Sequence, residues 1–143
     1  MTTEQHTRRT VEELLDRIGA GEPERIAEMF AEPVEWGLSW PAEGHPALPW
    51  IRPRSNRADV ADHFRQLDDF HVREKNGTTV DRILVDGADA VVLGRIVQTV
   101  KATGREYASP VALHLTVENG LISRYHIYED SLTIAEALTA GPR

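Results

Sequence analysis

Four segments in the second half of the chain have the features of β-strands, and they constrain the fold more than any other part of the sequence. They are separated by glycine-containing turns and read HVREKNGTTVDRILVDG, DAVVLGRIVQTVKATG, REYASPVALHLTVENG and LISRYHIYE. Strands that follow one another through short turns usually pair in the antiparallel way. Residues 71–129 therefore predict a sheet built largely from neighbouring segments.

Helices are predicted ahead of this sheet. In residues 7–19, Thr10 and Glu13 have the spacing of a capping box. The apolar residues of this segment recur at i, i+3, i+4 and i+7, as on one face of a helix: Val11, Leu14, Leu15 and Ile18. A short helix is expected after Pro23, and a third after residue 55 has His63 beside its apolar stripe of Val60, Phe64 and Leu67.

A first strand is predicted between the second and third helices, where VEWGLSW alternates apolar and polar residues. Helices followed by a run of antiparallel strands indicate an α+β fold, with three helices packed on one face of a curved sheet. Such a sheet encloses a cone, and a cone has an apolar pocket. The length of 143 residues fits one domain over residues 1–143.

A proline-rich segment interrupts this pattern between Pro41 and Ser55. Its four prolines exclude a helix interior or a central strand, so residues 41–55 are predicted to be a loop. Loops of this length often cover a site. Trp50 lies within the loop, and we expect it to cover the mouth of the pocket.

The composition limits the classes of function. A formal net charge of -7, with the arginines interleaved with acids, disfavours nucleic-acid binding. No apolar run approaches the roughly 18 residues that cross a bilayer, and MTTEQHTRRTVEELL has no apolar signal region. We therefore expect a cytoplasmic protein without a membrane partner. The absence of cysteine excludes disulfides and thiolate nucleophiles.

Two segments resemble a known superfamily. GAGEPERIAEMFAEPVEW (19–36) resembles the opening of ketosteroid isomerase and of the SnoaL-like polyketide cyclases, in the NTF2-like superfamily. GREYASPVALHLTVENGLISRYHIYED (104–130) resembles the closing hairpin of limonene epoxide hydrolase and of the phenazine biosynthesis A/B proteins. The resemblance implies the cone fold and a homodimer formed through the outer face of the sheet. It does not imply one activity, because this fold hosts several.

The resemblance to ketosteroid isomerase places its catalytic groups on apolar residues of this chain. The general base falls at Trp36, the oxyanion-hole tyrosine at Leu14 and the oxyanion-hole aspartate at Leu113. Proton abstraction needs a positioned base. These three positions supply none.

The other relatives place some polar groups on this chain. In the epoxide-hydrolase pattern, Arg95 keeps one of the charged strand positions, whereas Trp36, Leu38, Val97 and Ile127 replace the other polar residues. The phenazine-type glutamate also falls at Ile127, while the histidine of that family falls at His63.

The turn of the last hairpin decides which side chains face the pocket. A two-residue turn at 119–120 would pair Leu113 with His126 and place charge opposite an apolar face. A three-residue turn at 118–120 pairs Leu113 with Tyr125 and gives a consistent apolar face, so we favour it. Tyr125 and Ile127 are then predicted to face inward, with the following residues outward: His114, Arg124, His126 and Tyr128.

Three polar residues are the candidates for catalysis: His63, Tyr125 and Arg95. Each also has a purely structural interpretation: His63 as a core histidine, Tyr125 as a core aromatic residue and Arg95 as one half of a cross-strand ion pair. Ten further residues are predicted to line the substrate pocket: Leu14, Trp36, Leu38, Trp40, Trp50, Phe64, Ser109, Val111, Leu113 and Ile127.

No metal or cofactor is expected. His45 and His71 have no ligand partner at metal-binding spacing, and neither a glycine-rich phosphate loop nor a nucleophile elbow is present.

Three functional hypotheses remain. Because the implied carboxylates are replaced by apolar residues, we expect a cyclase of polyketide metabolism that closes a ring on a hydrophobic substrate, by a pericyclic (4+2) route with little acid-base help. A variant is isomerisation or aldol closure with His63 as the base. The alternatives are a non-catalytic binding protein for an apolar metabolite and a partner-binding protein that uses the outer sheet.

Overall fold

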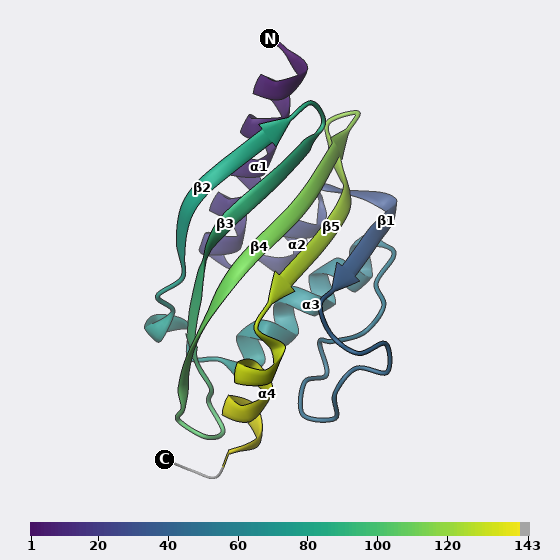
Figure 1. Ribbon diagram of the computed structural model, residues 1–143. Helices are drawn as coiled ribbons and strands as arrows, with labels where there is room; N and C mark the ends of the chain where they lie inside the picture. Colours follow the sequence, from purple (N-terminus) through teal and green to yellow (C-terminus); the bar gives the residue numbers. More distant parts are fainter. Residues whose placement is uncertain (141–143) are drawn as a thin grey trace.

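The computed structural model describes residues 1–140, and four α-helices and a five-stranded sheet make up this part of the chain (Figure 1). The helices are α1 (Thr3–Ala20), α2 (Pro23–Ala27), α3 (Arg57–Phe70) and α4 (Ser131–Thr139). The strands are β1 (Phe30–Leu38), β2 (Thr79–Asp86), β3 (Asp89–Thr99), β4 (Glu106–Glu118) and β5 (Leu121–Glu129). A short 3-10 helix, η1 (Arg73–Lys75), follows α3.

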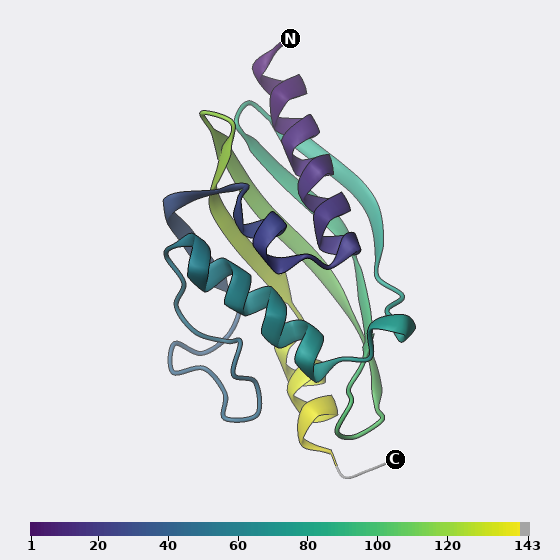
Figure 2. The ribbon, with the colours of Figure 1, turned by 180° about the vertical axis from the view of Figure 1, so that it is seen from behind.

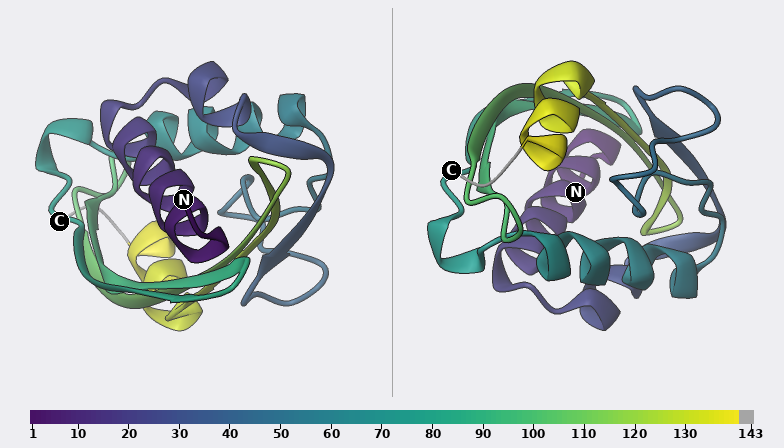
Figure 3. Two further views of the ribbon diagram at one scale, coloured as in Figure 1. Left: turned by 90° about the horizontal axis from the view of Figure 1, so that it is seen from above. Right: turned by 90° about the horizontal axis from the view of Figure 1, so that it is seen from below.

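The sheet has the order β1-β5-β4-β3-β2 and is curved without closing (Figure 3). α1, α2 and α3 lie on its concave face, as the view from behind shows (Figure 2). The predicted α+β cone is therefore confirmed. β2 to β5 pair antiparallel as predicted, whereas β1 lies parallel to β5. A parallel pair needs a long connection, and the chain between β1 and β5 provides one that contains the loop, α3 and strands β2 to β4.

The first helix begins earlier than the sequence pattern predicts. Thr2, rather than Thr10, is its N-cap: the Thr2 hydroxyl accepts a hydrogen bond from Gln5 N at 3.1 Å, and Gln5 Oε1 accepts one from Thr2 N at 2.8 Å. Thr7 is buried and donates to the Gly87 carbonyl at 2.8 Å. These contacts extend the helix beyond its apolar stripe.

The β4–β5 turn differs from the predicted three-residue turn. Glu118 pairs with Leu121, and both Asn119 (φ 53°) and Gly120 (φ 76°) are left-handed, as in a two-residue type I′ turn. The register then shifts, because Ser123 bulges out of the ladder.

This bulge restores the predicted faces through a different pairing. Leu113 pairs with Ile127 and Leu115 with Tyr125, so the predicted pairing of Leu113 with Tyr125 is wrong. The extra residue exchanges the two faces of β5. Tyr125 and Ile127 therefore still lie on the concave side, and Ile122 is the buried residue before the bulge.

The proline-rich segment 41–55 has no helix or strand apart from one isolated bridge. It is nevertheless fastened to α3, because the buried side chain of Arg54 donates to Asp62 at 2.7 Å and to Gln66 at 2.9 Å. Trp50 is consequently held against the fold and is only 4% exposed.

The apolar core lies between the helices and the concave face of the sheet. Within residues 1–140, no helix has the length and apolar character needed to cross a membrane.

Candidate functional site

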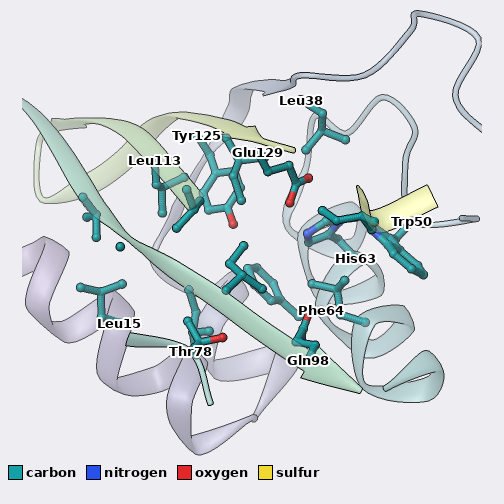
Figure 4. A pocket seen from close by; sticks show the side chains of 18 of the residues that line it. Leu15, Leu38, Trp50, His63, Phe64, Thr78, Gln98, Leu113, Tyr125 and Glu129 are labelled. Atoms are coloured by element: carbon teal, nitrogen blue, oxygen red, sulfur yellow. The ribbon is translucent and has the colours of Figure 1, made fainter. Parts of the chain in front are cut away.

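A cavity of about 170 Å³ lies between α3, the loop and the concave face of the sheet (Figure 4). Its size is of the order of a cavity that holds one aromatic ring. Most of its walls are apolar, and they come from both layers: Leu15, Ile18, Leu38, Trp50, Ile51, Phe64, Leu67, Val80, Val92, Ile96, Val111, Leu113, Ile127 and Ile134. The polar side chains that line it are His63, Thr78, Thr79, Gln98, Tyr107, Tyr125 and Glu129.

His63 is a buried, neutral imidazole in the cavity wall. α3 places it beside Trp36, whose ring it meets edge-on with centroids 4.8 Å apart. Burial, helped by the charge of Arg54, lowers the pKa of His63 to about 3 although the Trp50 carbonyl acts in the opposite direction. Nδ1 of His63 has no hydrogen-bond partner within residues 1–140. His63 is thus a weak base at neutral pH.

Tyr125 presents a hydroxyl group to the cavity. Its ring stacks on Trp36 with centroids 4.3 Å apart and an interplanar angle of 11°, which fixes its orientation. In the part of the chain described here, nothing hydrogen-bonds to the hydroxyl, which points into the cavity in Figure 4. Burial and the charge of Glu129 raise the pKa of Tyr125, so the phenol stays protonated and can donate.

Glu129 is a carboxylate that the sequence interpretation missed. It lies at the end of β5 and lines the cavity on the same side as Tyr125. Trp40 Nε1 donates to its Oε2 at 2.9 Å. Ser39 holds its backbone: the Ser39 hydroxyl accepts from Glu129 N at 2.9 Å and donates to the Glu129 carbonyl at 3.3 Å. The position of Glu129 is therefore fixed by the residues that follow β1.

The electrostatic setting of Glu129 strengthens it as a base. Burial raises the pKa of this carboxyl group, and the hydrogen bond from Trp40 only partly opposes the shift. None of the cavity-lining residues is Lys or Arg. A carboxylate without a neighbouring cation in an apolar cavity accepts protons more readily than one in water.

Tyr107 and Gln98 form a second polar group in the cavity. They are cross-strand partners on β4 and β3. The Tyr107 hydroxyl oxygen lies 2.9 Å from His71 Nε2 and 2.7 Å from Gln98 Oε1. His71, for which the sequence showed no partner at metal-binding spacing, is thus hydrogen-bonded to the sheet through Tyr107.

The structure brings seven of the predicted site residues to the cavity surface besides His63: Tyr125, Leu38, Trp50, Phe64, Val111, Leu113 and Ile127. Glu129 shares the odd-numbered face of Tyr125 and Ile127. The alternation along β5 could therefore have identified it.

Arg95 is the clearest correction among the predicted catalytic residues. Its side chain is exposed, because β3 sends its even-numbered residues, including Gln98 and Val92, toward the cavity. Period-two alternation then directs Arg95 to the convex face. Arg95 cannot contact a ligand in this cavity.

Four predicted pocket residues lie behind the cavity surface. Leu14 is fully buried in the core, while its neighbour Leu15 lines the cavity. Trp36 supports Tyr125, and Trp40 supports Glu129. Ser109 is also fully buried, where its hydroxyl accepts from Asp130 N at 2.8 Å and donates to the Pro110 carbonyl at 2.8 Å. These side chains shape the site without facing it.

Residues 1–140 contain no group of three or more His, Asp or Glu side chains placed to hold a metal ion. The cavity instead combines a hydroxyl donor at Tyr125 with a carboxylate base at Glu129 in apolar surroundings. Such an arrangement can bind a carbonyl oxygen and remove a proton from the neighbouring carbon.

Comparison with known proteins agrees with this fold. The SnoaL-like domain matches residues 11–125. An NTF2-like protein from Burkholderia thailandensis E264 superposes with a TM-score of 0.78 at 19% identity, over 98% of this chain and 99% of that one. A protein assigned as a SnoaL-like polyketide cyclase, from Jannaschia sp. CCS1, gives 0.77 at 17% identity, over 99% and 97%. No curated protein matches significantly. The chain belongs to the SnoaL-like domain family and has the NTF2-like fold.

Proposed function

We propose that this protein is an enzyme that transfers a proton at the carbon next to a carbonyl group, in a small and mostly apolar substrate. Isomerisation and aldol ring closure of a polyketide-like compound both begin in this way. The observation that carries the proposal is Glu129, a carboxylate whose burial raises its pKa in a cavity that Tyr125 also lines.

The proposed mechanism uses the two polar side chains of β5. Tyr125 donates a hydrogen bond to the substrate carbonyl oxygen, where negative charge develops as the enolate forms. Glu129 takes the proton from the adjacent carbon and returns it to another carbon or, in ring closure, to the new alkoxide. The apolar walls exclude water and hold the substrate in a reactive conformation.

This proposal revises the sequence hypotheses on two points. The expected pericyclic route rested on the absence of a carboxylate, and Glu129 supplies one two residues beyond the position that the resemblance implied. The alternative with His63 as base is disfavoured, because a histidine with a pKa of about 3 is a poor proton acceptor. Binding of an apolar metabolite without turnover stays the second candidate, supported by the apolar walls.

Hydrogen–deuterium exchange at carbon tests the proposal without knowledge of the natural substrate. 4-Methylcyclohexanone is incubated with the protein in D₂O, and loss of the proton signals next to the carbonyl is followed by NMR. We expect exchange above the buffer rate, reduced roughly 10²- to 10⁴-fold in Glu129→Gln, since removal of a general base has effects of this size.

Glu35→Gln is the matched control, because Glu35 lies on the convex face, where it pairs with Arg124 at 3.0 Å. It should exchange at the wild-type rate. Catalysed exchange that survives in Glu129→Gln would contradict the role of Glu129. Ligand binding without exchange for a series of small ketones would favour the binding protein, whereas ring closure of a linear polyene by Glu129→Gln would favour the pericyclic route.

A further inference from the structure

The Tyr107–Gln98 end of the cavity has no part in the proton transfer proposed above. In Figure 4, Gln98 lies across the cavity from the Tyr125 hydroxyl and the Glu129 carboxylate. Tyr107 and His71 are 5% and 3% exposed, so their hydrogen bonds form away from water. A buried chain of polar groups has to satisfy every donor and acceptor.

The proton positions along this chain follow from its first member. His71 Nδ1 lies 2.8 Å from the Leu67 carbonyl oxygen, which can only accept, so Nδ1 carries a hydrogen. Burial lowers the pKa of His71 and so favours the neutral ring. Its Nε2 is then an acceptor, and the Tyr107 hydroxyl, 2.9 Å away, donates to it.

The remaining contact of the phenol fixes the orientation of Gln98. Tyr107 has a single hydroxyl proton, and it is used in the hydrogen bond to His71. The atom of Gln98 nearest to the same oxygen is Oε1, at 2.7 Å. Oε1 can only accept, and the Tyr107 oxygen has no second proton to give, so the amide group of Gln98 must take the opposite orientation, with its NH₂ group toward Tyr107. Its carbonyl oxygen is left at the free end of the side chain. No group within residues 1–140 hydrogen-bonds to that end, and Gln98 lines the cavity.

We propose that the carbonyl oxygen of Gln98, held in place by Tyr107 and His71, is a binding site for a hydroxyl group of the substrate. A hydrogen bond to a neutral acceptor offsets the desolvation of a hydroxyl group, whereas it does not offset the larger desolvation cost of an ammonium group. The inference rests on the proposed function in one respect: the carbonyl group of the same molecule binds Tyr125. The substrate class is then a small hydroxy ketone.

A pair of ligands that differ only at this group tests the inference. 4-Hydroxycyclohexanone and 4-methylcyclohexanone replace hydroxyl by methyl on the same ring, and each dissociation constant is measured by calorimetry in wild type, Gln98→Met and Glu129→Gln. The change from Gln to Met keeps the length of the side chain and removes the amide acceptor. The preference for the hydroxy ketone should fall about three- to tenfold in Gln98→Met, the value of one hydrogen bond.

Glu129→Gln separates this site from the catalytic one. The preference should stay within about twofold of wild type in that variant, since hydrogen bonds to Gln98 are untouched. A preference that collapses in Glu129→Gln and persists in Gln98→Met would place the hydroxyl at Glu129 and overturn the inference. A preference that persists in both would overturn it as well. The proposed proton transfer is judged separately, because 4-methylcyclohexanone has no hydroxyl group.

The proton assignment can be tested in the unmodified protein. In ¹⁵N-labelled wild type near pH 7, the nitrogen signals of His71 should be those of a neutral ring protonated at Nδ1, and His71→Gln assigns them by their loss. An imidazolium, or a ring protonated at Nε2, would turn the Gln98 amide around and overturn the inference. This measurement does not depend on whether Gln98→Met folds.

Discussion

Tyr125 and Tyr128 lie three residues apart on β5, yet the first is 4% exposed and the second 53%. The same contrast holds for the carboxylates near them. Glu129 is half-buried in the cavity wall and accepts a hydrogen bond from Trp40. Glu35, on the neighbouring β1, instead pairs with Arg124 at 3.0 Å and with His126 at 3.4 Å on the convex face.

The two faces show that environment, rather than residue type, makes a group reactive. On the convex face, water and opposite charges support the ionised carboxylate, and such exposed pairs contribute little free energy. On the concave face, burial raises the pKa of both Tyr125 and Glu129. The same substitution made on each of the two faces should therefore have unequal effects.

The largest difference is expected for histidine in the pH dependence of stability. The folded-state pKa of His63 is about 3, below the usual 6.5, so the unfolded chain binds a proton that the folded chain does not. The contribution of neutral His63 to the free energy of unfolding is full above pH 6.5. It falls as the pH drops from 6.5 toward 3, by up to roughly 5 kcal/mol. His63→Gln should remove this part of the decline in urea unfolding between pH 7.5 and 4.5.

His126→Gln is the comparison on the convex face. Burial also lowers the pKa of His126, but its side chain is 23% exposed and Glu35 opposes the shift, so the same sign and a smaller effect are expected. Equal pH slopes for His63→Gln and wild type would show that His63 titrates normally in the folded protein.

The two tyrosines should differ in catalysis. Tyr125→Phe removes the proposed donor to the carbonyl oxygen and should slow the exchange of 4-methylcyclohexanone protons about 10²-fold, as expected for one oxyanion donor. Tyr128→Phe should leave the rate unchanged. Both variants keep the aromatic ring, so unfolding curves should match wild type. A similar rate for both would remove Tyr125 from the mechanism.

The smallest effect concerns stability and has an unusual sign. Because the folded-state pKa of Glu129 is raised, its contribution to stability is full below pH 4.5 and is lost as the pH rises through the folded pKa. At pH 8 the ionised carboxylate therefore destabilises the folded state. Glu129→Gln should unfold at a higher temperature, with a free energy of unfolding that is larger by about 0.5–1 kcal/mol.

That gain should disappear near pH 4, where wild-type Glu129 is also neutral. Glu35→Gln should instead lose a little stability at pH 8, because its ion pairs are broken. Thermal unfolding at the two pH values measures both variants. Destabilisation of Glu129→Gln at pH 8 would mean that the ionised form is favoured in the fold.

The architecture could be predicted because its signals repeat along the chain. The apolar stripe of α1 and the alternation in β2 to β5 each recur over several turns or residue pairs, so local errors at their ends do not change the element. The resemblance of residues 19–36 and 104–130 to a known superfamily then supplied the arrangement of the layers.

The pairing of β4 with β5 depends on a single residue and could not be predicted with the same security. Asn119-Gly120 is a strong type I′ signal, but without a bulge it would send charge into the core. The bulge at Ser123 satisfies both requirements. No residue type marks such a bulge, since Ser123 is as compatible with a regular strand.

The catalytic candidates show a different kind of limit. The alternation from Tyr125 through Ile127 predicts that Glu129 also faces the cavity, whereas the resemblance to other families points to Ile127. Arg95 was placed by such a comparison alone, and alternation with Gln98 on β3 directs it outward. Side-chain direction was a better guide than aligned position.

The three tryptophans give this site a built-in optical reporter. Trp50 lines the cavity, Trp36 stacks on Tyr125, and the indole NH of Trp40 bonds to Glu129. The composition contains three tryptophans in all, so every strong ultraviolet emitter of the chain lies at the cavity or one contact away. A bound molecule should change the intrinsic fluorescence directly, and libraries of colourless ligands can be screened without a label.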